Sequence, residues 1–498
     1  MNSEEPKLTL DGQAIACDPK SVETIIPFAI ELVLKKCPKI DAVVHRVVHG
    51  GSDFSQPVLI TEEVLSTIKQ NTPLAPLHNP ANLLGIYAAQ AILPQTKHVA
   101  IFDTAFHSTL PTRAREYALS EELRSKHKLR RYGFHGTSHS YVATRAAEFL
   151  KTDLKDLRVI SCHLGNGCSL AAIEYSRSVE TSMGFTPLEG LVMGTRCGDL
   201  DAGIILSLMQ SGEYSADQLE RILNKESGLK GLTAGTSDMR DIIENAENGD
   251  EPSRLALHVF SHRLRKYIGA YAAVMGGVDA IVFTGGIGEN SSVIRHRATQ
   301  RLHFLGAIID EDKNRDITLS SKNDVDEFSV EHSRVKLLAV KTDEQLSMAQ
   351  MAHALINKSA TVADLSIPIA ISARHIHLTQ ESVEILFGKG HQLRARNALS
   401  QPGQFAAEET VDIIGPKQTI EHVRILGPAR SINQVEISRT DEFTLGVDAP
   451  VRASGKIDNT PGITLEGPNG RLTLEKGLIC AWRHIHMHPN DAVRFQVS

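Results

Sequence analysis

The side chains of this sequence that are best suited to chemistry lie where apolar segments end in polar, glycine-rich turns. One such turn is HLGNG at residues 163–167, between the apolar segments 159–162 and 169–173, and this pattern predicts a β-hairpin. Glycine lets a ligand approach the main chain closely, and successive N–H groups can then hold an anion. Most Asn-Gly turns only reverse the chain. The turn by itself is therefore consistent either with phosphate binding or with a simple reversal of the chain.

Charged side chains and histidines occupy similar positions elsewhere. Arg46 belongs to the apolar segment DAVVHRVVHGG (41–51), and Asp103 to the predicted buried strand VAIFDTAFH (99–107). His135 belongs to RRYGFHGTSH (130–139), which we interpret as a functional loop before a helix that begins near residue 140. A cation within an apolar strand is costly unless it is paired, so Arg46 is either a member of an ion pair or an anion ligand.

Further polar turns follow later in the chain. The segment TSMGFTPLEGLVMGTRCGDLD (181–201) is expected to be a shaped loop that presents Arg196. DAIVFTGGIGEN (279–290) predicts a buried strand, a glycine turn and then a helix from about residue 291, which suits contact with a nucleotide. Glu344 follows a predicted strand, where a carboxylate can hold a hard cation. Such cations and carboxylates match the needs of phosphoryl transfer, with separate salt bridges as the alternative.

A second candidate site is a near repeat of Arg-His-Ile-His. His375 and His377 are two residues apart, as are His484 and His486, so on a strand each pair shares a face and can bind one cation. The alternative is a pair of exposed strand histidines, but two copies favour a metal, and imidazole suits zinc. Glu436 is a candidate carboxylate ligand and Arg430 a candidate anion-binding residue.

The elements that position these residues alternate between strands and helices as far as a plausible linker at 356–366. Helices are expected at 21–36, at 81–93 with Asn79 as its cap and Pro80 in its first turn, and at 253–275. Beyond the linker, short β-like segments broken by Gly and Pro are typical of an all-β barrel or sandwich. The sequence therefore predicts an α/β part followed by an all-β part.

Composition excludes several classes of function. A chain of 498 residues with 41% hydrophobic and 22% charged residues is typical of a globular protein with two to four domains. The net charge of −6 and the lack of a basic run argue against nucleic-acid binding, and no apolar run is long enough for a membrane span. No secretory signal precedes the first element, and the scattered cysteines indicate reduced thiols, so a cytoplasmic location is expected.

Residues from about 40 to 355 resemble the acetate kinase (acetokinase) family of the sugar kinase/actin-like superfamily. The matching stretches are HRVVHGG, APLHNP, FDTAFH, RRYGFHGTSH, HLGNG, TSMGFTPLEGLVMGTR, FTGGIGEN and TDEQ. The resemblance implies a two-lobed, ribonuclease H-like fold. It also implies reversible, ATP-dependent and Mg²⁺-dependent phosphorylation of a short-chain carboxylate, acetate or propanoate, to an acyl phosphate.

The resemblance also implies roles for individual residues. Arg46 would bind the substrate, Asp103 would be the active-site acid/base carboxylate, and His135 and Arg196 would stabilise the transferring phosphoryl group. Glu344 would ligate Mg²⁺, in a TDEQ sequence where the family usually has TNEE. The residues expected to bind ATP are His163, Leu164, Gly165, Asn166, Gly167, Asp238, Met239, Arg240, Gly286, Ile287, Gly288, Glu289 and Asn290.

Residues from about 367 to 498 resemble the zinc-dependent phosphate propanoyltransferase family of propanediol utilisation. The matches are SARHIHL, LSQPGQFAAEETV, VRILGPARSINQVEISRTDEF and RHIHM. The resemblance implies transfer of an acyl group between coenzyme A and phosphate. His375, His377 and Glu436 would hold one zinc, His484 and His486 the second, and Arg430 would bind phosphate. The acyl phosphate made by one activity is consumed by the other.

These resemblances predict a first kinase lobe at 1–150, a nucleotide-binding lobe at 151–355, a linker at 356–366 and the acyltransferase-like domain at 367–498. Acetate kinases normally begin with a phosphate loop of the form N-x-G-S-S-S-x-K, and nothing like it precedes Ala42. The acyltransferase family normally continues to a further metal-binding His beyond Ser498. The alternative function is therefore a truncated, catalytically impaired scaffold that binds nucleotide or metal. A homodimer is expected, and the choice between acetate and propanoate stays open because it depends on about one methylene of room.

Overall fold

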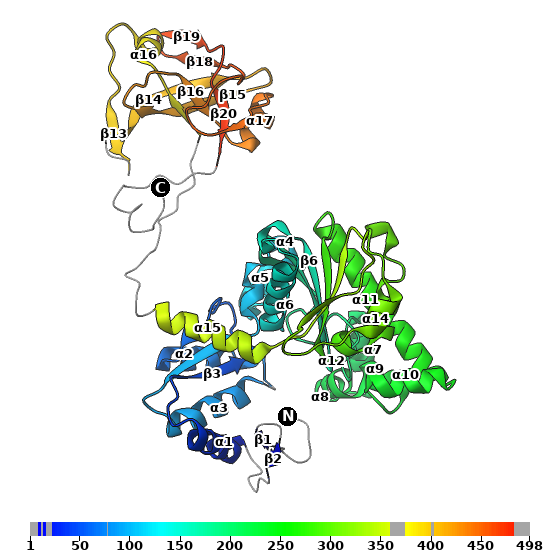
Figure 1. The fold of residues 1–498 in the computed structure, drawn as a ribbon. Coiled ribbons are helices and arrows are strands. Elements are labelled where there is room, and N and C mark those ends of the chain that lie inside the picture. Colours follow the sequence, from blue (N-terminus) through cyan, green and yellow to red (C-terminus); the bar gives the residue numbers. More distant parts are fainter. Residues whose placement is uncertain are drawn as a thin grey trace. The chain divides into compact units, whose positions relative to one another are not determined.

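The structure, a computed structural model, describes residues 8–10, 13–15, 22–76, 78–358, 374–399 and 403–482. The chain divides into two units, Met1–Thr361 and Val362–Ser498, each of which is described by itself (Figure 1). Within the described ranges, no helix has both the length and the apolar character that a membrane crossing requires.

A small sheet in the first unit is built from β3 (Ala42–Val47), β5 (Lys97–Phe102) and β4 (Val58–Leu59), in the order β3-β5-β4. Alternate side chains of β5 enter opposite cores, as the strand period of two requires. Phe102 packs with α2 (Glu62–Gln70) and α3 (Asn79–Ile92), whereas Ile101 packs with α15 (Glu344–Lys358). Helix α1 (Val22–Lys36) packs against α3, and β1 (Leu8–Leu10) pairs with β2 (Gln13–Ile15). Because β3 and β5 are parallel, Arg46 near the end of β3 lies beside Asp103, which follows β5.

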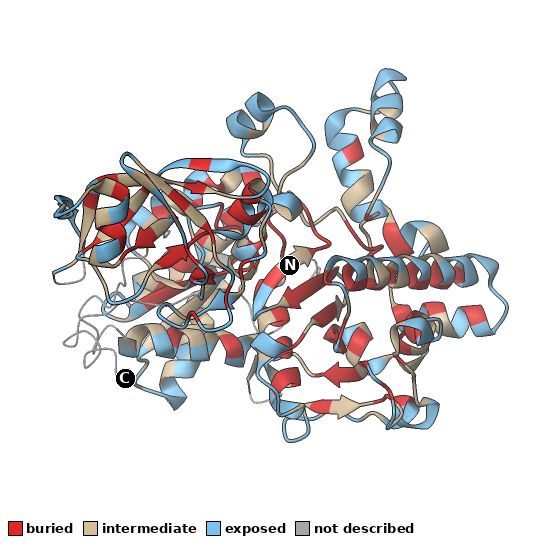
Figure 2. Cartoon of the chain, turned by 90° about the horizontal axis from the view of Figure 1, so that it is seen from above, coloured by how far each residue is buried: buried red, intermediate tan, exposed pale blue. Residues whose placement is uncertain are grey.

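A larger sheet has the order β10-β11-β9-β6-β7-β8. Its strands are β6 (Val159–Leu164), β7 (Cys168–Glu174), β8 (Arg177–Thr181), β9 (Ala280–Thr284), β10 (Val325–Glu327) and β11 (Lys336–Val340). Buried residues dominate its strands (Figure 2). Strands β6, β9 and β11 are parallel, so their carboxyl ends bring the HLGNG turn, the GGIGEN segment and Glu344 to one edge. The predicted hairpin is present as the antiparallel pair β6–β7.

Helices cover both faces of the larger sheet. Phe260, Leu264 and Ile268 of α11 (Glu251–Val274) pack on one face, and Val142 and Ala146 of α6 (Gly136–Phe149) pack on the other. The remaining helices of this unit are α4 (Thr112–Arg115), α5 (Glu121–His127), α7 (Ala202–Gln210), α8 (Ala216–Arg221), α9 (Gly228–Thr233), α10 (Met239–Glu247), α12 (Gly285–Asn290), α13 (Ser292–Thr299) and α14 (Glu311–Asp316). Short 3₁₀ segments are Thr72–Leu74, Ala105–Thr109, Leu154–Asp156 and His303–Leu305, and Ile222–Glu226 is a π-helical turn.

The prediction that Asn79 caps α3 is wrong. The helix begins at Asn79 itself, and the cap position is occupied by His78. The Asn79 side chain is fully buried, accepts a hydrogen bond from the His49 N–H at 3.3 Å and donates one to the His49 carbonyl at 3.1 Å. These bonds satisfy the main chain just beyond β3.

Helix α6 begins earlier than predicted, and the predicted glycine turn at 285–288 is itself helical, whereas the helix expected from about residue 291 is confirmed as α13. Helix α6 begins at Gly136, not near residue 140, because the left-handed His135 (φ 56°) turns the chain and the Gly136 N–H donates to the Asp103 carbonyl at 2.9 Å. A Cβ on Gly136 would lie 2.4 Å from that carbonyl, so the position requires glycine. The GGIGEN segment is helix α12 and not an open turn, because the Glu289 carboxylate accepts the Gly285 N–H at 2.9 Å and thereby satisfies the start of the helix.

The described residues of the second unit, 374–399 and 403–482, form a nine-stranded sheet that curls into a half-barrel, with two short helices, α16 (Gln380–Phe387) and α17 (Arg439–Leu445). Its order is β17-β20-β16-β12-β15-β14-β18-β19, with β13 paired to β14. The strands are β12 (His375–His377), β13 (Ala395–Ala398), β14 (Phe405–Ile414), β15 (Thr419–Gly427), β16 (Gln434–Glu436), β17 (Val451–Arg452), β18 (Thr464–Gly467), β19 (Gly470–Thr473) and β20 (Leu478–Ala481). Ile376, Val411, Ile413, Ile425 and Leu465 are among the side chains of its core.

Candidate active site

Arg46 is held by two carboxylates at the edge of the small sheet. Its Nε and Nη2 donate to the two oxygens of Asp103, each at 2.8 Å, and its Nη1 lies 3.4 Å from Glu344 Oε2. Such a forked pairing fixes the guanidinium plane. Asp103 follows β5 and Glu344 begins α15 after β11, so the trio joins the small three-stranded sheet to the larger six-stranded sheet. The ion-pair interpretation of Arg46 is confirmed, and the side chain is still 40% exposed to solvent.

The electrostatics of this trio suit a divalent cation. Burial opposes the charge of Arg46, but the hydrogen bond and charge of Asp103 outweigh it and raise the arginine pKa above its usual value. Burial raises the pKa of Glu344, and the negative charge of Asp103 raises it further, against the opposing effect of Arg46. A hard cation would relieve the repulsion between the two carboxylates, so these residues fit Mg²⁺.

His135 belongs to a buried chain of hydroxyls and imidazoles. Ser169 Oγ lies 2.8 Å from His135 Nδ1 and 2.8 Å from His139 Nε2, and His139 Nδ1 lies 2.9 Å from Ser161 Oγ. The His135 ring stacks on that of His163, with 4.4 Å between centroids. The two serines therefore fix the orientation of both imidazoles in the chain.

These histidines are neutral at neutral pH. Burial, followed by the charges of His163 and other neighbours, lowers the pKa of His135 well below its usual value. Burial and the charge of Arg46 lower the pKa of His163 to about 4. A neutral imidazole donates only one N–H, so the partner of each nitrogen decides which one carries the proton.

Arg196, His135 and the HLGNG turn meet at Gly167. A Cβ on Gly167 would lie 3.0 Å from Arg196 Nη2 and 3.5 Å from His135 Nε2. Arg196 Nη1 donates to the Pro187 carbonyl at 2.7 Å, and no carboxylate in the described part of the chain pairs with this arginine. Burial lowers the Arg196 pKa, as expected for a cation without a counter-ion. Arg196 Nη2 and His135 Nε2 therefore lie where both could donate hydrogen bonds to an anion near Gly167.

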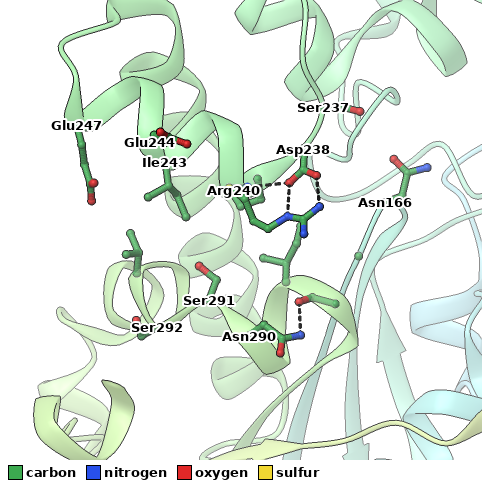
Figure 3. Close-up of a pocket in the computed structure, with 15 residues that line it drawn as sticks. Asn166, Ser237, Asp238, Arg240, Ile243, Glu244, Glu247, Asn290, Ser291 and Ser292 are labelled. Carbon is green, nitrogen blue, oxygen red and sulfur yellow. Dashed lines mark hydrogen bonds and ion pairs between the residues drawn. The ribbon is translucent and has the colours of Figure 1, made fainter. Parts of the chain in front are cut away.

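Gly165 and Asn166 of the same turn line a cavity of about 800 Å³ (Figure 3). Asp238 caps α10 there through the Arg240 N–H at 2.9 Å and pairs with the Arg240 guanidinium at 2.6 Å, which lowers the Asp238 pKa to about 2. Of the residues expected to bind ATP, those that line the cavity are Gly165, Asn166, Asp238, Met239, Arg240, Gly286, Ile287 and Asn290.

The other residues expected to bind ATP lie outside that lining. His163 and Leu164 belong to β6, and Gly167 faces Arg196 and His135. A Cβ on Gly288 would lie 3.2 Å from the Phe283 main chain, so Gly288 permits the packing of α12. Glu289 accepts the N–H groups of Gly285 and Thr342 at 2.9 and 3.0 Å, which makes it an internal structural partner.

A separate cluster in the second unit fits a metal ion. His375 and His377 share one face of β12, and Glu436 is the register partner of His375 on the antiparallel β16. One ligand atom from each lies within 4.8 Å of the other two, and His375 Nε2 is 3.5 Å from Glu436 Oε2. His377 Nδ1 is buried and has no hydrogen-bond partner among the described residues. Two imidazoles and a carboxylate form a donor set that zinc prefers, and the unpaired Nδ1 of His377 is available as a ligand atom.

Arg430 lies close to this cluster. The pKa of His377 is lowered to about 3, mainly by burial and secondly by the positive charge of Arg430. Arg430 Nη2 donates a hydrogen bond to Gln404 Oε1 at 3.2 Å. Burial lowers the pKa of Arg430, and the negative charge of Glu436 partly opposes this shift. His484 and His486, the second predicted pair, lie outside the described residues.

The model of the acetokinase family matches residues 9–350. The chain belongs to the acetokinase family. The model of phosphate propanoyltransferase matches residues 368–498. The acetate kinase of Thermotoga maritima is 53% identical over 327 residues, which is 66% of this chain and 80% of the relative, and that of Clostridium novyi is 49% identical over the same length and shares.

Solved structures agree with this assignment. The acetate kinase of Porphyromonas gingivalis is 40% identical, with a TM-score of 0.67 over 70% of this chain and 89% of that chain. The propionate kinase of Francisella tularensis is 41% identical, with a TM-score of 0.64 over 68% of this chain and 86% of that one. The predicted two-lobed kinase fold is thereby confirmed, and the chain is an enzyme of the class that transfers phosphoryl groups to carboxyl acceptors.

Sequence reasoning about this acetokinase missed part of the cavity wall. Ile243, Glu244 and Glu247 line the cavity together with Arg240, and they lie three, four and seven residues after it on α10. This helical spacing places them on one face and would have identified them. His78, just before α3, is an exposed residue whose pKa is lowered by partial burial of its ring and then by the charge of Arg196.

Proposed function

We propose that this chain transfers the γ-phosphoryl group of ATP reversibly to the carboxylate of acetate or propanoate. The observation that carries the proposal is that Arg196 and His135 approach Gly167, in the turn whose Gly165 and Asn166 line the 800 Å³ cavity. The charge of Arg46, which is paired with Asp103, also acts on His135. A nucleotide in the cavity would direct its terminal phosphate toward Gly167. The carboxylate acceptor would approach from the exposed side of Arg46.

In this reaction an oxygen of the acceptor carboxylate bonds to the γ-phosphorus, and the bond to the leaving oxygen of ADP breaks. The acceptor is already ionised at neutral pH, so its attack needs no general base. Asp103 then contributes by orienting Arg46 and by its charge. Glu344 and Asp103 would hold Mg²⁺, which would neutralise the phosphate charge when it is bound.

His135 and Arg196 act on the transferring group as donors. If His139 Nε2–H donates to Ser169 Oγ, the Ser169 hydroxyl donates to His135 Nδ1, and His135 Nε2 carries the proton. That N–H lies on the side of Gly167 and Arg196 Nη2, where equatorial phosphoryl oxygens would accept it. Fixed donors at developing charge are the main means by which such enzymes accelerate transfer.

The test is formation of acyl phosphate and ADP from acetate or propanoate and Mg-ATP by the full chain. Arg196→Ala should lower turnover by about 10³-fold, because it removes a charged donor from the transition state. Arg254→Ala is the matched control, since Arg254 pairs with Glu251 on the surface of α11. Retained nucleotide binding without any turnover in the unaltered chain would contradict the proposal and favour the scaffold alternative.

We further propose that residues 367–498 interconvert acyl-CoA and acyl phosphate. A phosphate oxygen would attack the thioester carbonyl, the C–S bond would break, and coenzyme A would leave as the thiolate. His375, His377 and Glu436 would hold zinc, His484 and His486 a second zinc, and Arg430 would bind the phosphate. The proximity of Arg430 to the buried cluster supports this assignment.

The experiment is release of coenzyme A from acetyl-CoA or propanoyl-CoA with phosphate, with and without a chelator. Glu436→Gln should abolish release and leave kinase turnover intact. His391→Gln is the control, because the half-buried His391 forms another His–Glu pair, 2.9 Å from Glu409, that is not part of the cluster. Equal loss of kinase and acyltransferase turnover in Glu436→Gln would contradict the proposed division into a kinase (1–355), a linker (356–366) and an acyltransferase (367–498).

We propose that the chain acts as a cytoplasmic homodimer. Helix α7 is strongly apolar and has no buried residue, and Ile204, Leu206 and Met209 are 45%, 58% and 46% exposed. A second copy of the chain would cover this face. Leu206→Glu should convert the dimer to a monomer in light scattering, whereas Leu123→Glu on the exposed side of α5 should not. The described cysteines are all free, as expected for the cytoplasm.

A further inference from the structure

A second cavity in the first unit, of about 500 Å³, is lined mainly by basic side chains, four of them arginines. None of its lining residues is acidic. It is formed by α11, by α13 and by the residues that follow α13. Its basic residues are His258, His262, Arg263, Arg265, Arg297 and Arg301. We call it the arginine cavity.

Most of these arginines lack a counter-ion. Arg263 pairs with Asp199 at 3.1 Å, but no carboxylate pairs with Arg265, Arg297 or Arg301 in the ranges that the structure covers. Arg265 donates one N–H to the Arg297 carbonyl, while its Nε is buried without any hydrogen-bond partner among the described residues. Burial and the positive charge of Arg301 lower the pKa of Arg265.

Local structure accounts for only part of this arrangement. Arg297 and Arg301 lie near the carboxyl end of α13, where the helix dipole favours cations. The dipole does not satisfy Arg265 Nε, nor the buried hydroxyl of Ser261, which also lines the cavity and has no partner in the described part of the chain. A buried donor without an acceptor is costly, so the cavity is built for a ligand that supplies acceptors.

We propose that the arginine cavity binds a small oxyanion that carries at least two negative charges, either a polycarboxylate or a polyphosphate. Guanidinium groups recognise carboxylate and phosphate oxygens in pairs, which explains arginine at these positions in place of lysine. The volume is ample for one such anion. Ser261 would add a neutral donor to the charged ones.

The arginine cavity contacts two parts of the kinase cleft. Residues 291–293 at the start of α13 line the 800 Å³ cavity, and Arg297 near the end of the same helix lines the arginine cavity. Arg263 Nη1 donates to the Gly190 carbonyl at 3.3 Å, in the loop that also carries Arg196. An anion in the arginine cavity therefore changes nucleotide affinity, and by linkage the nucleotide changes anion affinity by the same factor. This coupling rests on the proposed nucleotide site, whereas the anion site does not.

The test uses the full chain in isothermal titration calorimetry at low salt with saturating ADP, and citrate or pyrophosphate as the probe. We expect one of the two to bind with one-to-one stoichiometry, and this outcome identifies the class of anion. Arg301→Gln and Arg265→Gln should each weaken binding by about tenfold, the value of one charged hydrogen bond. Lys266→Gln, which removes an exposed cation from the same helix, should leave the affinity unchanged.

Two results would overturn the anion site: no binding of either probe at millimolar concentration, or equal affinity in both arginine variants and the unaltered chain. If Arg265→Gln fails to fold, the exposed Arg301→Gln still decides the matter. Coupling is measured as the ADP affinity with and without the anion, and a change of about threefold or more that vanishes in Arg301→Gln is expected. An unchanged ADP affinity overturns the coupling alone, and a failure to bind ADP contradicts the proposed nucleotide site instead.

Discussion

The variant Ser169→Ala tests whether kinase turnover depends on the orientation and tautomer of the His135 ring, because it leaves His135 in place and removes the hydroxyl that contacts it. The Ser169 hydroxyl is fully buried and lies 2.8 Å from both His135 Nδ1 and His139 Nε2. Alanine removes a single oxygen and leaves both ring nitrogens without that partner. A buried polar group left unsatisfied costs about 1–3 kcal/mol, so the variant should lose on the order of that amount of stability.

The effect on turnover follows from the tautomer of His135. Without the Ser169 hydroxyl, nothing holds the His135 proton on Nε2, and the ring can also turn away from Gly167. We expect kcat to fall about 10- to 100-fold, which corresponds to about 1.4–2.7 kcal/mol of transition-state stabilisation. The KM for ATP should change little, because Ser169 does not line the nucleotide cavity.

Ser178→Ala is a closely matched control. Ser178 Oγ lies 2.8 Å from His107 Nδ1, and both residues are buried, but His107 donates to the Phe134 carbonyl and not toward Gly167. This control should lose a similar amount of stability and keep kcat within about twofold of the unaltered chain. The assay is acyl phosphate formation at saturating ATP and acetate, with thermal unfolding measured in parallel.

The reasoning would be refuted by one clear result. If Ser169→Ala loses as much stability as Ser178→Ala but retains its kcat, the Ser169 hydroxyl stabilises the fold and has no role in turnover. His135 would then need no fixed tautomer, and Arg196 would have to supply the stabilisation by itself. A rise in KM for ATP with unchanged kcat would also contradict the proposed role, because it would place Ser169 in substrate binding.

Three further predictions address other features. Gly167→Ala should lower kcat/KM about tenfold without unfolding the chain, because the new Cβ would lie 3.0 Å from Arg196 Nη2; unchanged steady-state kinetics would contradict this. Burial lowers the pKa of His107 and His163 to about 4 from 6.5, so the unfolded chain binds more protons between these values. Stability is therefore complete above pH 6.5 and falls by up to about 1.4 kcal/mol per pH unit for each histidine as the pH drops toward 4, and a Tm that stays constant from pH 7 to pH 5 would contradict this. His377→Ala should reduce bound zinc, measured by elemental analysis, and preserve kinase turnover; undiminished zinc would argue against the cluster.

The sequence predicted those elements whose patterns are local. The β6–β7 hairpin follows from alternating apolar segments around Gly-Asn-Gly, and the α11 helix from an apolar period of 3.6. The pairing of His375 with His377 on one face follows from the strand period of two. In each case the residues that decide the structure are neighbours in the sequence.

Contacts between distant segments could not be predicted from local pattern. Asn79 lies where the sequence predicts a helix cap. Its side-chain amide instead accepts a hydrogen bond from the N–H of His49, 30 residues earlier, and donates one to the His49 carbonyl. The Ser169 bridge joins residues 34 apart, and a single sequence gives no sign that the two would meet. The arginine cavity combines two helices whose cations, taken separately, are typical of solvent-exposed faces.

Glu289 shows how a residue can belong to a nucleotide motif and still act through the scaffold. Its carboxylate accepts the N–H of Gly285 after β9 and the N–H of Thr342 after β11, at 2.9 and 3.0 Å. It therefore ties together the ends of two neighbouring parallel strands at the edge of the sheet. Glu344 stands two residues beyond Thr342, so this bond also fixes the start of α15 and the position of the carboxylate beside Arg46. Two segments that the sequence presents as separate sites, one for nucleotide and one for a cation, are thus held at a fixed distance by one half-buried side chain.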